Sequence, residues 1–165
     1  MSEVLSQYFL QGVMFGQLEV CKALVGRVNL ETRDGNDNTA LHIASLSGQV
    51  DMVSLLLQCG VQVNAFDSEL DTALHCAAMN GHLEVCKELV RFGADVFARN
   101  ALDQSPQDYA QQNRERVVER YLRKEALKQV LVVLRSAQEV KRISKHSPIA
   151  ALPKDLCRLL QGFLC

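Results

Sequence analysis

The sequence predicts an all-α fold, a solenoid of stacked helix–turn–helix units. The first observation is an internal repeat: residues 39–67 and residues 72–100 read almost alike, displaced by 33 residues. The second is that each copy runs into an apolar segment of helical spacing that ends on glycine, "VDMVSLLLQCG" and "LEVCKELVRFG". A unit of this size cannot bury its apolar face alone, so we expect neighbouring units to stack.

The repeat contains a specific motif, Thr-x-Leu-His-x-Ala, followed by a glycine. This pattern resembles the ankyrin repeat family, whose units recur about every 33 residues. The resemblance implies that each unit is a helix, a turn, a second helix and an extended hairpin, and that the chain is an ankyrin-repeat solenoid. The matching residues are Thr39, Leu41, His42, Ala44 and Gly48 in one copy and Thr72, Leu74, His75, Ala77 and Gly81 in the next.

About four repeats are expected over residues 1–122, and the terminal ones are altered. The central units span residues 34–66 and 67–99. The first unit, 5–33, keeps "GQLEVCKALV" but lacks the Thr-x-Leu-His opening. The last unit, 100–122, has "SPQDYA" at that place, with Asp108 instead of His and Arg114 instead of Gly. Altered end units are usual in repeat proteins, so 100–122 is interpreted as a capping unit.

Local chemistry explains why these residue types recur. The threonine that opens each motif is a predicted N-cap, since its hydroxyl can accept a hydrogen bond from a free backbone N–H. Gly48 and Gly81 allow a tight turn with positive φ between the two helices. The resemblance implies that His42 and His75 are structural and hydrogen-bond between neighbouring hairpins.

The hairpin tips depart from the family pattern at their fourth position, which is often glycine. Here it is Asp37, Leu70 and Asp103 in the three tips. Asp tolerates positive φ, but Leu does so only at a cost. Either the middle tip is rearranged, or Leu70 is an exposed apolar contact residue.

Catalysis, cofactors and metals find no support in the motifs. The sequence holds no GxSxG, Walker, HExxH or glycine-rich nucleotide pattern. The cysteines form no CxxC pair and are expected to be reduced and mostly buried packing residues: Cys21, Cys59, Cys76, Cys86, Cys157 and Cys165. We therefore expect no enzyme, no cofactor and no metal site.

Charge and hydropathy exclude two further classes of partner. The formal charge is −1 with a pI near 6.4, and no block of Lys and Arg is present. Nucleic acid is thus not an expected partner. The chain has no run of 18 apolar residues free of charge and no signal-peptide pattern, so no membrane association is expected. The expected location is the cytoplasm, with the nucleus as an alternative.

Protein binding is what the family resemblance implies, on a concave surface formed by the hairpin tips and the first helix of each unit. Phe66, Leu70, Met79 and Leu102 would be its apolar anchors; the alternative for Phe66 and Met79 is that they only fill the stack. The expected surface consists of Asn36, Asn38, Leu46, Ser47, Phe66, Ser68, Glu69, Leu70, Asp71, Met79, Asn80, Arg99, Leu102, Gln104 and Gln112.

Asn64, in "LLLQCGVQVNA", stands at a hairpin position that resembles asparaginyl hydroxylation sites of ankyrin proteins. The resemblance makes it a candidate modification site. Its expected main role is a hairpin hydrogen bond.

The C-terminal region changes character. Residues 123–143 are expected to form a helix that either continues the last repeat or follows a break. The segment after residue 115 has apolar residues at helical spacing: Val117, Tyr121, Leu127, Leu131, Leu134 and Val140. Residues 144–165 are expected to form a linker and an amphipathic helix. "LPKDL" and the leucines after it resemble the cullin-facing half of a SOCS box or an F-box-like tail. The ligase-docking residues would be Leu152, Pro153, Leu156, Leu159, Leu160 and Phe163.

Two functions remain open at this point. In one, the chain is a substrate-recognition adaptor that captures a protein on the repeats and docks onto cullin, elongin or Skp-type subunits of a ubiquitin ligase. In the other, it is an ankyrin scaffold or inhibitor whose C-terminal helices only seal the stack.

Overall fold

The computed structural model describes residues 2–136 of the 165-residue chain. The chain divides into two compact parts, an N-terminal part, Met1–Glu119, and a C-terminal part, Arg120–Cys165. Throughout the described residues the regular structure is helical, which confirms the expected all-α fold. The linker and amphipathic helix expected over residues 144–165 lie outside the described residues.

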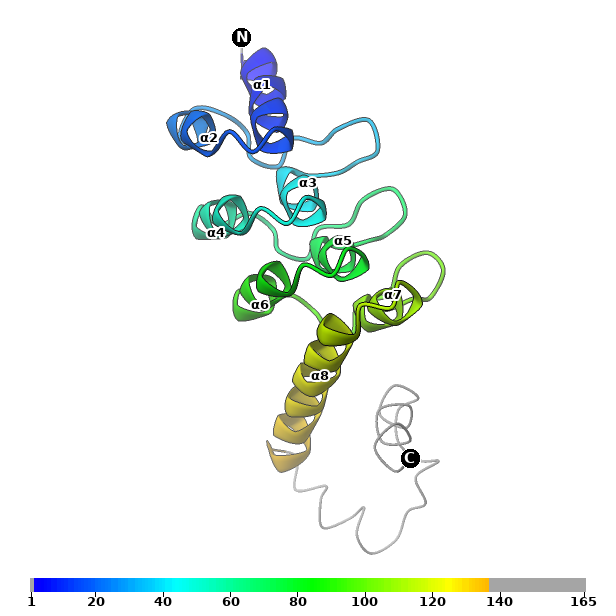
Figure 1. Cartoon of the computed structure of the whole chain (residues 1–165). Coiled ribbons are helices and arrows are strands. Elements are labelled where there is room, and N and C mark those ends of the chain that lie inside the picture. The colour runs from blue at the N-terminus through cyan, green and yellow to red at the C-terminus, as the bar shows by residue number, and fades with distance from the viewer. Residues whose placement is uncertain (1, 137–165) are drawn as a thin grey trace, which may run out of the picture. The chain divides into compact units, whose positions relative to one another are not determined.

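The helices of the N-terminal part stack in two layers (Figure 1). The inner layer, from which the hairpin loops project, consists of α1 (Ser2–Met14), α3 (Ala40–Leu46), α5 (Ala73–Met79) and α7 (Pro106–Gln112). The outer layer consists of α2 (Leu18–Leu24), α4 (Val50–Gln58) and α6 (Leu83–Arg91). Each helix pair is followed by one hairpin, which is the unit that the repeat predicts.

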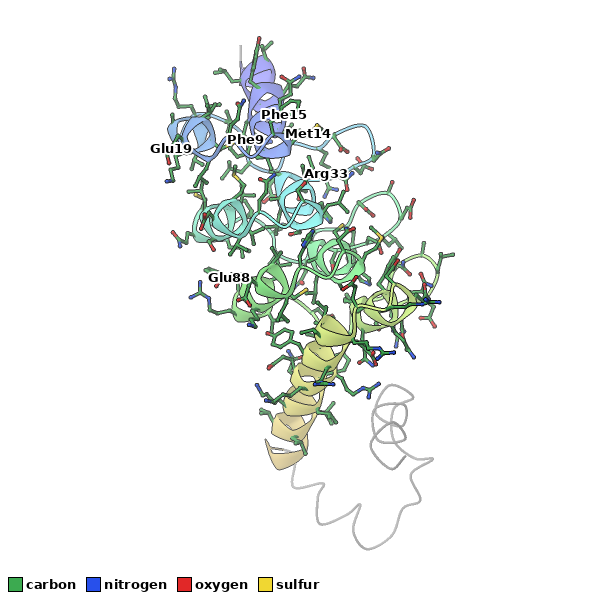
Figure 2. The ribbon with its side chains drawn as sticks, in the orientation of Figure 1. Phe9, Met14, Phe15, Glu19, Arg33 and Glu88 are labelled. Carbon is green, nitrogen blue, oxygen red and sulfur yellow. The ribbon has the colours of Figure 1, made fainter. Side chains whose placement is uncertain are left out.

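The core lies between the two layers. Leu41 of α3 and Leu74 of α5 are almost fully buried, as are Leu56 and Leu89 of the outer helices. Figure 2 shows Phe9, which is fully buried, at the junction of α1 and α2. Burial of each such side chain contributes about 1.5–3 kcal/mol to the free energy of unfolding. The stack is therefore stabilised by the same apolar positions in successive units.

α8 (Arg116–Ser136) is one continuous helix, so the structure selects continuation over a break. The apolar stripe differs from the expected one, since Val117 and Leu131 are exposed at 66% and 52%. Val118 and Leu122 are buried instead, because they stand 33 residues after Val85 and Leu89 and keep their register. The buried positions recur at every fourth residue: Val118, Leu122, Ala126 and Val130.

A buried histidine links each central unit to the next. Thr39 is the N-cap of α3, as expected, and its backbone N–H donates to His42 Nδ1 at 3.2 Å. The Thr39 hydroxyl lies 2.9 Å from the same nitrogen. Because Nδ1 accepts, the ring proton is on Nε2, which donates to the Asp71 carbonyl of the next hairpin at 3.1 Å. His42 therefore caps its own helix and binds the neighbouring unit.

The next unit repeats this arrangement in detail. Thr72 N–H donates to His75 Nδ1 at 3.1 Å, and His75 Nε2 bonds the Gln104 carbonyl at 3.0 Å. Burial lowers the pKa of both His42 and His75 below the usual 6.5. The two imidazoles are thus neutral at pH 7, which is the form that the hydrogen bonds require. The expected structural role of these histidines is confirmed.

The last unit keeps the cap but not the link. Ser105 Oγ donates to Asp108 Oδ2 at 2.8 Å, and Asp108 N–H donates to Ser105 Oγ at 3.2 Å. A carboxylate has no proton with which to reach another hairpin carbonyl. Asp108 therefore caps its helix with no bond of the kind that His42 and His75 make to a following hairpin, as expected of a capping unit.

A second link between units passes over Gly48. His82 Nε2 lies 3.1 Å from the carbonyl oxygen of Leu46, so its ring crosses the turn of the preceding unit. A Cβ on Gly48 would approach that ring to 2.7 Å, and φ there is +70°. Glycine is therefore required twice at this position, for its backbone conformation and for the space.

The three hairpin tips share one conformation. The side chains of Asp34, Asp67 and Asn100 each accept two backbone N–H bonds across their own tip. Backbone bonds also join neighbouring tips, from Ser68 N to Asn36 O at 3.3 Å and from Ala101 N to Glu69 O at 2.9 Å. The repeat thus sets both the shape and the register of the tips.

Two large residues occupy backbone conformations that usually belong to glycine. Leu70 has φ +60°, matching Asp37 at +60° and Asp103 at +57°. Arg114 has φ +64° where the preceding units have glycine. The middle tip is therefore not rearranged; Leu70 accepts the conformation and is also exposed. For a residue with a Cβ this region costs about 1–2 kcal/mol.

We predict that Leu70→Asn raises the free energy of unfolding by about 0.5–1 kcal/mol, because Asn tolerates positive φ better than Leu. Urea unfolding followed by circular dichroism measures the change. Leu102→Asn is the matched control, since Leu102 is an exposed leucine of a neighbouring tip that is absent from the positive-φ residues. A gain for Leu102→Asn as large as that for Leu70→Asn would contradict the backbone explanation.

We also predict that acid weakens the stack through its buried histidines. Because folding lowers the pKa of His42 and His75, the unfolded chain takes up protons first as pH falls below about 6.5. Their stabilising effect is complete above that pH and is lost below it, by up to about 1.4 kcal/mol per histidine and pH unit.

Urea unfolding between about pH 7.5 and pH 5 tests this. The variant His42→Gln/His75→Gln keeps an acceptor and a donor at each site. It should show a smaller loss of stability with acid than the wild type. His82→Gln, in the turn rather than the motif, serves as the control. Equal pH slopes for wild type and double variant would count against the histidines as the cause.

Candidate functional site

The expected partner-binding residues gather on one side of the N-terminal part, residues 1–119. We call this the hairpin surface: the tips 33–38, 66–71 and 99–104 together with the exposed positions of the inner helices. Five of the expected residues are half-buried: Asn38, Asp71, Met79, Arg99 and Gln104. The others are exposed: Asn36, Leu46, Ser47, Phe66, Ser68, Glu69, Leu70, Asn80, Leu102 and Gln112.

Three apolar side chains stand out at the tips. Leu102 is 73% exposed, Leu70 is 49% exposed and Phe66 is 46% exposed. Each belongs to a tip held by its own hydrogen bonds, so the side chains are presented by an ordered backbone. Exposed apolar groups on a rigid frame with a polar rim are where binding energy concentrates in protein interfaces.

Some of the expected contact residues already have intramolecular roles. The Asp71 carboxylate accepts from Asn100 Nδ2 and from the Tyr109 hydroxyl, both at 3.0 Å. Burial, followed by the bond to Asp71, raises the pKa of Tyr109 to about 12, so its hydroxyl keeps the proton that it donates. The Tyr109 ring meets His75 edge to face, with centroids 5.7 Å apart. Asp71 thus helps to hold the last unit on the stack.

The arginines of the tips are engaged with backbone oxygens. Arg99 Nη1 donates to the Asp103 carbonyl at 2.9 Å and to Asp108 Oδ2 at 3.0 Å. Arg33, which the sequence analysis did not select, does the same one step earlier: its Nη1 donates to the carbonyls of Asp37 at 2.8 Å and Phe66 at 2.6 Å. Arg33 therefore ties the first tip to the second.

Met14 and Phe15 also belong to the hairpin surface, although the sequence analysis missed them. They are 53% and 72% exposed at the end of α1, and Figure 2 shows them on the side of that helix nearest Arg33. Alignment of "GVMFGQLEV" with "AAMNGHLEV" through the shared glycine would have found them. In that register Met14, Leu46, Met79 and Gln112 occupy one position on the inner helices.

Asn64 makes the hairpin hydrogen bonds expected of it. Its Nδ2 donates to the Gly93 carbonyl at 3.1 Å, and its Oδ1 accepts from Asp95 N–H at 2.9 Å. Both partners lie in the following unit. Asn64 therefore contributes a third type of link between neighbouring repeats.

Three of the four described cysteines are buried packing residues. Cys21, Cys76 and Cys86 are buried, and burial raises the pKa of Cys76 and Cys86 to about 12. These thiols stay protonated and act as packing groups. Cys59 departs from the expectation of burial, because it follows the last turn of α4 and is exposed. Cys157 and Cys165 lie outside the described residues.

Other kinds of site find no support between residues 2 and 136. In that part of the chain no group of three or more His, Cys, Asp or Glu is placed to hold a metal ion. Nor is any helix there long and apolar enough to cross a membrane. The six residues expected to dock onto a ligase, all between 152 and 163, lie outside the described residues.

Comparison with known proteins agrees with the geometry. A family model of ankyrin repeats matches residues 9–100 in three copies, which is more than half of the chain. No curated protein sequence matches it. Ankyrin repeats are non-catalytic interaction domains, so the coarse function is protein–protein interaction. With the paired helices, the histidine links and this match in place, the chain belongs to the ankyrin repeat family.

Proposed function

We propose that the repeats capture a protein partner on the hairpin surface, and that the chain is a substrate-recognition adaptor of a cullin-type ubiquitin ligase. The first part concerns the described residues. The second rests on the sequence resemblance of residues 144–165.

The observation that supports the binding proposal is the strained backbone conformation of the exposed residue Leu70. A leucine at φ +60° costs backbone energy, and at 49% exposure its burial returns little of it. The same position in the other tips is Asp, which tolerates the conformation. Strained residues that the fold does not need concentrate at binding sites. Leu70, together with Phe66 in the same tip and Leu102 in the next tip, is therefore the proposed centre of the contact.

We predict that Phe66→Ser/Leu70→Asp/Leu102→Ser lowers the affinity for a captured partner about tenfold or more, because it removes the exposed apolar groups of the tips. Affinity purification with quantitative mass spectrometry, followed by titration of the retained protein, measures this. Helical circular dichroism should be unchanged, since none of the three side chains is in the core.

The matched control changes exposed apolar residues of the outer layer, Val20→Ser/Val50→Ser/Phe92→Ser. This variant should keep the partner. If the outer-layer variant loses the partner while the tip variant retains it, the binding surface lies on the outer helices and not at the tips.

Opposite charges on the two parts of the chain favour an adaptor with two different partners. Residues 1–119 carry 16 Asp and Glu against 8 Lys and Arg, a formal charge of −8. Residues 120–165 carry 10 Lys and Arg against 3 Asp and Glu, a formal charge of +7. Surfaces of opposite sign attract different proteins. The net charge of −1 conceals this division.

We predict that Leu156→Asp/Leu160→Asp releases cullin, elongin or Skp-type subunits from pull-downs with the full chain, because it places charges in the apolar stripe that would fill a groove on the ligase. The control Ser144→Asp/Gln161→Asp adds the same charge outside that stripe. Wild-type protein that retains none of these subunits, while still binding a partner on the tips, would favour the scaffold or inhibitor instead.

A further inference from the structure

The two faces of the N-terminal part, residues 1–119, differ in how their acidic residues are paired. On the outer helices, three of the four acidic residues pair with a base three positions later, the exception being Asp51 of α4. Glu19 pairs with Lys22 at 2.7 Å, and Glu84 with Lys87 at 2.7 Å. Glu88 likewise pairs with Arg91 at 2.6 Å. Figure 2 shows Glu19 and Glu88 on the layer away from Arg33 and the hairpins. Three of the four outer acids are thus neutralised within their own helix.

The hairpin tips carry acids without such pairs. Across the three tips, six Asp and Glu stand against two Arg. Both arginines are bound to carbonyl oxygens, as described above. Among the described residues, no ion pair involves the carboxylates of Asp37, Glu69 or Asp103, one on each tip, and all three are exposed. With six acidic residues against two arginines, the three tips together carry a formal charge of −4.

Acidic and apolar groups alternate along the row of tips in a fixed register. Asp37, Leu70 and Asp103 occupy the same position of successive tips, with φ between +57° and +60°. A leucine thus lies between two carboxylates. Each hairpin adds two extended segments to the row, and hydrogen-bonded segments lie about 4.8 Å apart. Equivalent residues of neighbouring tips are then about 9–10 Å apart, which agrees with the usual spacing of packed helices.

That spacing selects the form of a partner. A segment in the polyproline II conformation rises about 3.1 Å per residue with about three residues per turn, so its every third side chain lies on one face and would meet a new tip. A helix would need about seven residues for the same distance. The carboxylates on either side of Leu70 would pair with Lys or Arg of the partner, and Leu70 would pack against an apolar side chain of the partner.

We infer that the hairpin surface recognises a basic segment of a partner protein in the polyproline II conformation, in which a large apolar residue has Lys or Arg three positions before it and three positions after it. The apolar residue packs on Leu70, and the cations pair with Asp37 and Asp103, while Glu69 adds to the attraction beside the centre. This inference rests on the proposed binding function of the same surface and names the chemistry of its partner.

A random linear peptide library displayed on phage and selected on the full chain tests the pattern. The enriched peptides should carry Lys or Arg three residues on either side of a large apolar residue, above the frequency in the library. Enrichment of acidic peptides, or of basic peptides with cations about seven residues from the apolar position, would overturn the inference.

Charge variants then test the contact with one enriched peptide, synthesised with a fluorescent label and titrated by anisotropy. Asp37→Asn/Glu69→Gln/Asp103→Asn should weaken binding about tenfold, since three exposed pairs of modest strength are lost. Asn tolerates the positive φ of the two aspartates, so the tips should keep their shape. Glu19→Gln/Glu84→Gln/Glu88→Gln removes the same charge from the outer helices and should leave affinity within about twofold.

The two proposals fail in different ways. A peptide that is lost with Phe66→Ser/Leu70→Asp/Leu102→Ser but binds the tip charge variant as well as the wild type overturns the basic segment and leaves the binding surface intact. A peptide that binds every variant equally overturns both. An equal loss with both charge variants shows attraction to net charge alone and also overturns the inference.

Discussion

A neutral, buried imidazole is the interaction on which the arrangement of the units depends. His42 caps its own helix with one nitrogen and reaches the carbonyl of Asp71 in the next hairpin with the other. His75 does the same toward Gln104. A single side chain thus satisfies polar groups of two units at once, and both groups would cost energy if left buried without a partner. Because the ring is rigid, it also sets the spacing between hairpins.

The hairpin surface follows from that spacing. Tips that are hydrogen-bonded to one another and closed by Asp34, Asp67 and Asn100 offer their side chains in register. The side chains on this backbone frame differ in their contacts. Inward-facing polar groups such as Asp71 complete the stack, while Leu70 is left exposed in a strained conformation. Structural roles and the proposed binding role are therefore divided residue by residue within the same tip.

Charge is organised at a larger scale than the repeat. Three of the four acids on the outer helices are paired within their own helix, whereas Asp37, Glu69 and Asp103 of the tips take part in no ion pair among the described residues. The remainder of the chain is basic. Under the proposed adaptor function, such a division would steer oppositely charged partners to different parts of one molecule, because charges at interfaces act mostly on association rates and specificity.

The sequence by itself determined the family, the period, the caps and the glycine turns, because these depend on residues close together in the chain. The capping unit at Asp108 followed in the same way, whereas the histidine links, which join residues 29 positions apart, were implied only by the family resemblance. Only the tertiary structure decided that Leu70 takes positive φ without rearranging its tip, since neighbouring tips hold the backbone there. It also decided that Arg33 ties two tips together, that Cys59 is exposed and that the buried stripe of α8 lies one residue from the expected positions. Those outcomes depend on contacts between units, which no single repeat encodes.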